Sequence, residues 1–160
     1  MKKLNFGKNI PSAIIAMLAL ILIGLGCSAE KPAAPPTEAE AQTLVKNTMS
    51  EFADAVDKGD FAAFKANTSK EFQSQYTDEQ MKTTFKVFTD QKAAVVPILR
   101  DAAKKNVAFS PAPAVREENG YSVLVAGGTI DSDPQGVKVS NEYVYHDGKW
   151  KLLKVGVVLQ

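Results

Sequence analysis

Few side chains in this sequence of 160 residues could transfer a proton near neutral pH. Histidine is the usual group for that chemistry, because its charge changes between about pH 5 and 8. The chain has one, His146. It precedes Asp147-Gly148, a pair typical of a tight hairpin turn, and the alternating pattern puts it on the strand face of Lys138, Ser140 and Glu142. We therefore expect a solvated histidine at a hairpin end.

Carboxylates and phenols are the remaining acid–base candidates. Asp54 and Asp57 lie three residues apart near the end of a predicted helix and can share one face of it, where acids are normally solvated. Glu142 belongs to a predicted strand, where Tyr143 and Tyr145 alternate with it and point to the other side. The two rings are expected in the core or in a cavity wall. We interpret none of these residues as catalytic.

Metal, phosphate and nucleic-acid sites are not indicated. One histidine and one cysteine cannot supply a set of metal ligands, and Gly127-Gly128 lies within a predicted strand that no helix follows, unlike a phosphate loop. Three of the 19 basic residues precede Cys27 and all 18 acidic residues follow it. The later part therefore has 16 basic and 18 acidic residues, a net charge of −2, with no basic run to neutralise nucleic-acid phosphates. No cofactor is predicted.

Cys27 is the only cysteine, so an intramolecular disulfide is impossible. Three lysines open the chain, residues 14–25 form an apolar run without charge, and Gly26 precedes the cysteine. This order is typical of an export signal peptide. An uncleaved membrane anchor is the alternative, because residues 10–27 are about 18 residues long and could nearly cross a bilayer. Pro11 and the short apolar core favour the signal peptide.

Gly26-Cys27 at this place resembles the bacterial lipobox, in which a small residue precedes a cysteine that is acylated on sulfur. The resemblance implies a signal peptide over residues 1–26 and a lipid-modified Cys27 that anchors the protein to a membrane. The motif usually has Leu three residues before the cysteine, where this chain has Gly24. Ser28 in place of Asp resembles lipoproteins released to an outer membrane. The expected location is the cell envelope: the outer membrane, facing the periplasm, where the cell has one, and otherwise the outer face of the cytoplasmic membrane.

Residues 27–38 are expected to form a tether and residues 39–160 one domain. SAEKPAAPPT, over residues 28–37, has three prolines and no large apolar side chain, which favours an extended spacer. Thr37-Glu38-Ala39-Glu40 has the form of a capping box. It opens a predicted helix that Lys58-Gly59 ends. Further helical segments are expected near residues 61–64, 69–76, 77–88 and 97–105.

After Ser110 the apolar pattern changes to the period of two that is typical of strands. Asn119-Gly120 and Asp147-Gly148 predict hairpins, and residues 131–136 predict a turn between them. The sequence thus predicts an antiparallel meander of about four strands, near 115–118, 121–130, 137–145 and 150–159. Gly127-Gly128 indicates a bulge or a bend in a curved sheet. Helices first and strands last is an α+β order, with the helices packed on one face of the sheet.

Three stretches resemble the NTF2-like, cystatin-like superfamily, most closely its small lipoprotein-borne members of unknown function. They are DKGDF at residues 57–61, residues 68–72, and YVYHDGKWKL at residues 143–152. The resemblance covers roughly residues 40–160 and implies a sheet that wraps around the long helix and leaves a cone-shaped cavity. Because the superfamily includes isomerases, dehydratases, transport adaptors and domains without an assigned activity, it does not select a function.

Six of the eight phenylalanines fall in the helical half, which favours a packed core. The alternative is an apolar pocket for a small ligand, lined by Phe52, Phe85, Phe88, Tyr143 and Tyr145.

The function that the sequence favours is a membrane-tethered, non-catalytic domain that binds a small apolar ligand or another envelope protein. One alternative is an enzyme of the isomerase or hydrolase type that uses Asp54, Tyr143 or Glu142 in an apolar cavity. The other is a structural envelope component that forms a homodimer through its sheet.

Overall fold

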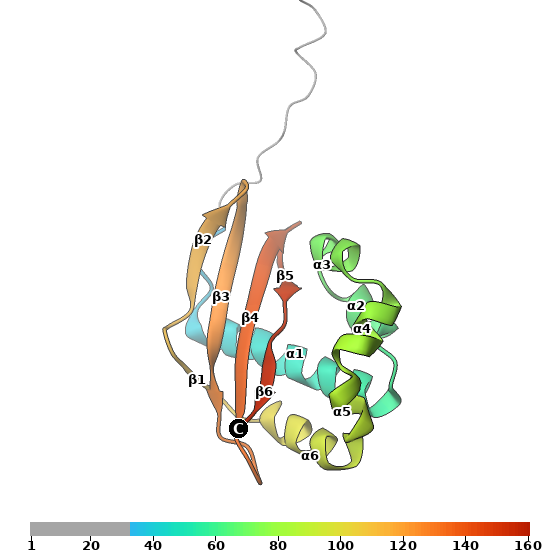
Figure 1. Ribbon diagram of the computed structural model, residues 1–160. Coiled ribbons are helices and arrows are strands. Elements are labelled where there is room, and N and C mark those ends of the chain that lie inside the picture. Colours follow the sequence, from blue (N-terminus) through green and yellow to red (C-terminus); the bar gives the residue numbers. More distant parts are fainter. Residues whose placement is uncertain (1–32) are drawn as a thin grey trace, which may run out of the picture.

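The computed structural model describes residues 33–160. The expected signal peptide, Cys27 and the first part of the tether lie outside the described residues. Within them, six helices precede six strands, so the α+β order is confirmed (Figure 1). The helices are α1 (Glu38–Lys58), α2 (Ala62–Ala66), α3 (Lys70–Gln75), α4 (Asp78–Thr84), α5 (Lys86–Asp90) and α6 (Lys92–Ala102). The strands are β1 (Val107–Phe109), β2 (Ala114–Glu118), β3 (Tyr121–Ile130), β4 (Val137–His146), β5 (Lys149–Lys154) and β6 (Val157–Leu159).

The long helix α1 begins and ends at the predicted signals. The backbone N–H of Thr37 donates to Glu40 Oε2 at 2.7 Å, and the backbone N–H of Glu40 donates to Thr37 Oγ1 at 3.3 Å. This reciprocal pair is the predicted capping box. At the other end Gly59 has φ +65°, the left-handed conformation that suits glycine. Thr77 and Gln80 form a second capping box at the start of α4.

Two helical predictions were wrong in detail. The expected helix over residues 77–88 is divided at Phe85 into α4 and α5. The helix expected from Pro97 begins five residues earlier, so Pro97 lies inside α6. Proline inside a helix removes one backbone hydrogen bond. Burial of Val95, Ile98 and Leu99 in the core offsets that cost.

The six strands occupy four positions across one antiparallel sheet. The central pair β3 and β4 keeps one register from Val123↔Val144 to Ile130↔Val137. Both β2 and β1 pair with β3, while β5 and β6 both pair with β4. The meander β2–β3–β4–β5 is as predicted, whereas β1 was not predicted and the last strand is interrupted at Gly156.

Gly127-Gly128 does not form a bulge against β4, because the register of that pair is continuous. Near these glycines the neighbour of β3 on its other side changes from β2 to β1. A Cβ atom at Gly128 would overlap the carbonyl oxygen of Ala108 in β1. The glycine therefore serves a close approach of two backbones. The register shift lies instead between β4 and β5, at Glu142 and Tyr143.

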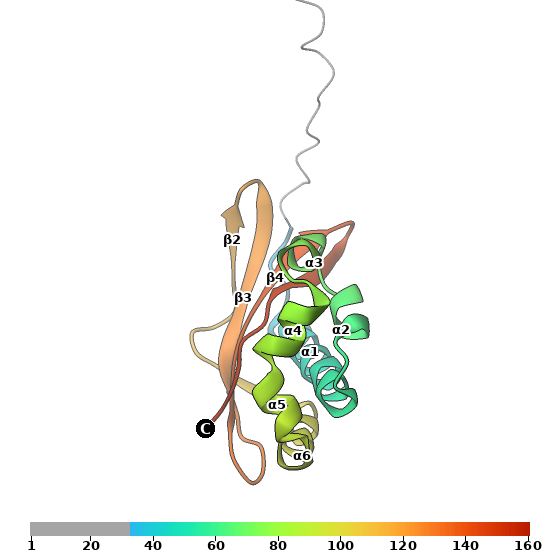
Figure 2. The ribbon, with the colours of Figure 1, turned by 45° about the vertical axis from the view of Figure 1, so that its right-hand side comes forward.

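The core lies between the sheet and the helices, which Figure 2 shows to one side of β3. Helices α1 and α6 pack against one face of the sheet, whereas α3 lies beside β5 at its edge. Phe52 of α1 is at its centre, with no exposed surface. Its ring centroid lies 4.9 to 6.2 Å from those of Phe61, Phe64, Phe85 and Phe88. The ring centroid of Phe72, in α3, lies 6.4 Å from that of Phe64. This aromatic cluster fixes α3 beside the sheet.

Candidate functional site

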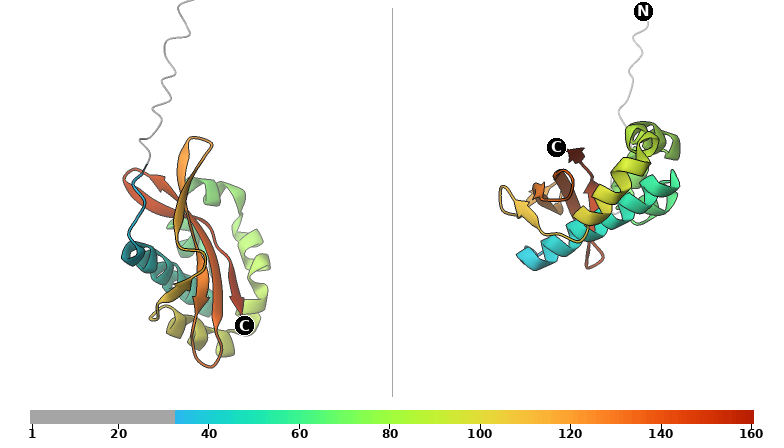
Figure 3. Two further views of the ribbon diagram at one scale, coloured as in Figure 1. Left: turned by 90° about the vertical axis from the view of Figure 1, so that its left-hand side faces the viewer. Right: turned by 90° about the horizontal axis from the view of Figure 1, so that it is seen from below.

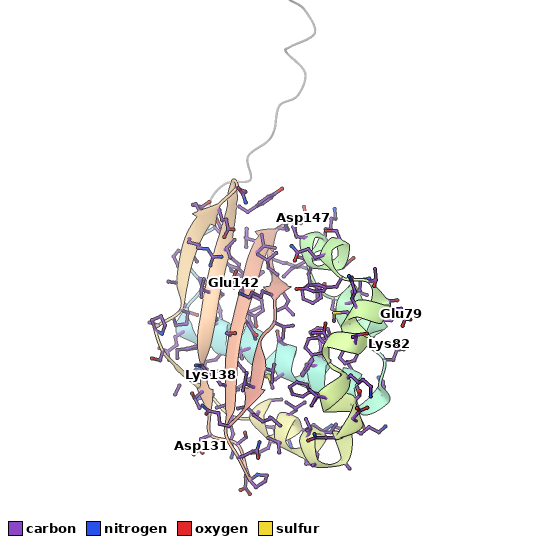
Figure 4. The ribbon with its side chains drawn as sticks, in the orientation of Figure 1. Glu79, Lys82, Asp131, Lys138, Glu142 and Asp147 are labelled. Carbon is purple, nitrogen blue, oxygen red and sulfur yellow. The ribbon has the colours of Figure 1, made fainter. Side chains whose placement is uncertain are left out.

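The strongest candidate site is a cleft of about 450 Å³ between α3 and the face of the sheet that points away from α1. We call it the α3 cleft. Tyr143 points toward α1, so its neighbours Glu142 and Val144 point to the opposite face. Figure 4 shows Glu142 and Lys138 along β4, with Asp147 at the turn beyond it. The α3 cleft is lined by Glu71, Gln75, Tyr76, Glu118, Asn119, Tyr121, Val123, Glu142, Val144, Leu153 and Lys154.

The floor of the α3 cleft is apolar. Val123 and Val144 are directly opposite each other in β3 and β4 and are 2% and 1% exposed. Leu153, at the register shift of β5, adds a half-buried side chain. Tyr76 lies on the α3 side and Tyr121, which is 40% exposed, lies on the β3 side. An apolar floor between aromatic rings is typical of a binding pocket for a small molecule.

The charged groups around the α3 cleft are paired with one another. An Arg116 guanidinium nitrogen lies 2.7 Å from a carboxylate oxygen of Glu118 and 2.8 Å from one of Glu142. Hydrogen bonds to Glu142, which have the larger effect, and to Glu118 raise the pKa of Arg116 above its ordinary value. Lys154 Nζ lies 3.8 Å from Glu142 Oε1. Glu142 therefore has a cation near each of its oxygens.

His146 lies beside the α3 cleft, where its Nε2 atom lies 3.0 Å from Oε1 of the lining residue Glu71. Its ring packs edge-on against Tyr121, with ring centroids 4.9 Å apart. Its side chain is 20% exposed, so the prediction of a solvated histidine was wrong. Lys138 and Ser140, on the same strand face, are exposed as expected. The difference arises because α3, which is remote in sequence, packs beside the hairpin end.

Glu71 is the charged partner of this histidine. Burial raises its pKa, but its own backbone N–H, the Ser69 hydroxyl and His146 outweigh burial, so the pKa lies below its ordinary value. The carboxylate therefore stays ionised near neutral pH. Glu71 Oε2 is buried and makes no well-aligned hydrogen bond to any residue of the described part of the chain.

Tyr143 lies in the closed core. Asn141 Nδ2 donates to its hydroxyl at 3.2 Å, and that hydroxyl lies 3.0 Å from Thr48 Oγ1. The Thr48 hydroxyl itself donates to the Leu44 carbonyl oxygen at 3.0 Å, so Tyr143 is the donor to Thr48. Burial raises the pKa of Tyr143 to about 12. The phenol therefore keeps its proton near neutral pH.

Asp54 and Asp57 share a face of α1, as predicted, and both point to α6. The Arg100 guanidinium of α6 lies 2.8 Å from Asp57 and 3.4 Å from Asp54. These exposed pairs join two helices and lie apart from the α3 cleft, so they are best explained as structural contacts.

The five residues expected to line an apolar cavity lie in two places. Phe52, Phe85, Phe88 and Tyr143 belong to the core or pack against it. Tyr145 instead lines a groove of about 720 Å³, which we call the tether groove, together with Trp150 of β5, Leu44 of α1 and residues 34–36. The aromatic residues of the α3 cleft, Tyr76 and Tyr121, were not predicted, because no local pattern marks them.

Residues 33–160 contain no group of three or more histidine, cysteine or acidic side chains that could hold a metal ion. In the same part of the chain, no helix has the length and apolar character needed to cross a bilayer. Neither a protein-family model, nor a curated protein, nor a solved structure matches this chain.

Proposed function

We propose that this protein is a cell-envelope lipoprotein whose α3 cleft binds a ligand without catalysing a reaction. The observation that carries the binding function is the cleft itself, an apolar floor under a rim of paired charges. The proposed anchor is a lipid on Cys27, supported by the signal-peptide pattern before it. A lipoprotein of the NTF2-like type is part of this proposal, supported by the long first helix and the antiparallel sheet that follows.

Binding is favoured over catalysis by the state of the acid–base candidates. The carboxylate of Glu142 is engaged in ion pairs, with Arg116 at Oε2 and Lys154 at Oε1. The Tyr143 hydroxyl is occupied by core hydrogen bonds. The ligand that fits is a small, partly apolar molecule, or a side chain of an envelope protein, whose apolar part covers Leu153 and the rings of Tyr76 and Tyr121.

The lipid anchor predicts that fatty-acid labelling depends on Cys27. In cells fed a clickable palmitate analogue, the wild-type protein is expected to take up the label, and Cys27→Ser is expected to lose it completely. Gly24→Leu, which restores the usual lipobox residue, is the matched control and should keep the label. Mass analysis of the mature N-terminus should place the acyl groups on Cys27. Label that persists in Cys27→Ser would contradict the proposed anchor.

The α3 cleft predicts that a charge on its floor weakens binding of an apolar probe. We expect Leu153→Asp to reduce the affinity for the neutral dye N-phenyl-1-naphthylamine by about tenfold or more, because an unpaired carboxylate against an apolar ligand is costly. The dye's fluorescence measures binding, and circular dichroism checks the fold. Val158→Asp is the matched control, since Val158 is 59% exposed and lies on β6 outside the cleft lining. Equal dye affinity in the two variants would show that the α3 cleft is not the binding site.

A further inference from the structure

The tether groove lies where the described chain begins. It has a volume of about 720 Å³ and is lined by Ala34, Pro35, Pro36, Ala39, Glu40, Thr43, Leu44, Tyr145, Gly148, Lys149 and Trp150. The rings of Tyr145 and Trp150 pack edge to face, with centroids 5.1 Å apart. Both rings are half-buried. They present apolar surface beside the tether and away from the α3 cleft, and Trp150 also packs against the edge of the core.

The start of the tether is attached to the domain at this end. The backbone N–H of Ala33 donates to Ser122 Oγ at 3.0 Å, and Ser122 lies near the start of β3. Figure 3 shows this first segment beside the β4–β5 turn, at the end of the domain that also carries the β2–β3 turn. Helix α5 and the β3–β4 turn lie at the opposite end (Figure 1).

The chain between Cys27 and Ala33 limits how far this end can be from the anchor. Six residue steps span at most about 20 Å, even when fully extended. An acylated Cys27 therefore holds the tether groove close to the membrane surface. At such a short distance the effective concentration of lipid is high, so a weak contact is sufficient to set the orientation of the domain.

On the basis of the lipid anchor proposed above, we infer that the tether groove faces the lipid surface, with Trp150 and Tyr145 at the level of the headgroups. Both side chains combine an apolar ring with a polar group, the combination that is enriched where membrane and water meet. Lys149 places an ammonium group at the same edge, and Asp147 on the same turn offsets its charge. The contact is therefore aromatic and depends little on anionic lipid.

Trp150 is the only tryptophan of the chain, so its fluorescence reports this groove alone. The full-length lipidated protein is reconstituted on phosphatidylcholine vesicles, with and without lipids brominated near the headgroup. We expect the brominated lipid to reduce Trp150 emission by about twofold or more, because bromine quenches only a ring at the membrane interface. Flotation of the vesicles in a density gradient shows in the same sample whether the protein is bound.

The matched control moves the single tryptophan to the far end of the domain. In Trp150→Phe/Val87→Trp the reporter lies on α5, at a side chain that is 57% exposed. Its emission should be unchanged by brominated lipid. Protein that floats with the vesicles while Trp150 stays unquenched would overturn the inferred orientation and leave the anchor intact. Equal quenching at both positions would overturn it as well. Failure of the wild-type protein to float would contradict the anchor itself.

Discussion

Phe52→Ala is expected to lower the free energy of unfolding by about 3–5 kcal/mol, the usual cost of removing a buried phenylalanine ring. Phe52 has no exposed surface, and its ring packs against those of Phe61, Phe64, Phe85 and Phe88. The cavity left by the substitution cannot be filled by one neighbour without displacing the others. Urea unfolding followed by circular dichroism measures the loss.

Phe88→Ala is the matched control for this substitution. Phe88 touches the same aromatic cluster, at 5.5 Å from Phe52, but its side chain is partly exposed. Its removal should cost clearly less, since less apolar surface is returned to water. If the two variants are equally destabilised, Phe52 is not the centre of the core.

The same cluster positions α3 through Phe64 and Phe72, so dye binding in the α3 cleft should also weaken in Phe52→Ala.

The second large effect is a loss of stability at alkaline pH that depends on Tyr143. An unfolded tyrosine loses its proton near pH 10, whereas burial raises the pKa of Tyr143 in the folded protein to about 12. A group whose pKa is raised on folding contributes stability that is fully present below its unfolded pKa and is lost as pH rises through its folded pKa. Tyr143 alone should therefore reduce the free energy of unfolding by about 2 to 3 kcal/mol between pH 10 and 12.

Tyr143→Phe isolates this effect, because other groups that titrate in the same range remain in both proteins. The difference in unfolding free energy between wild type and Tyr143→Phe should shrink or change sign from pH 9 to 12, as measured by urea unfolding at each pH. At neutral pH the variant should be less stable by about 1–3 kcal/mol, because the Asn141 amide loses its acceptor in the core. Tyr145→Phe, at the half-buried ring of the tether groove, is the control for removing a phenol hydroxyl outside the core cluster. A constant difference between wild type and Tyr143→Phe would refute the buried-phenol explanation.

The parts of the fold that follow from neighbouring residues could be predicted from the sequence. The capping boxes at Thr37 and Thr77 are formed as expected. The two predicted hairpin turns also occur, with Asn119 and Asp147 in the left-handed conformation. These signals depend on a few adjacent side chains and on local backbone geometry.

Features that depend on distant contacts could not be predicted in the same way. Helix α6 continues through Pro97 because its apolar face is buried against α1, a contact that no local pattern records. The α3 cleft brings Glu71 to His146, and Arg116 to Glu142, across long stretches of chain. Each side chain has an unremarkable sequence neighbourhood, so the site emerges only when the sheet and α3 are placed together.

The division of each sheet edge into two short strands has a consequence for how the protein behaves at high concentration. One edge consists of β2 and β1, of five and three residues, and the other of β5 and β6, of six and three residues. Long, uninterrupted edge strands invite pairing with another chain and lead to aggregation. Here each edge is broken, and the Leu152 carbonyl of β5 already accepts a hydrogen bond from Ser69. Copies crowded together on one surface can therefore remain separate, because neither edge offers a continuous ladder on which aggregates could grow.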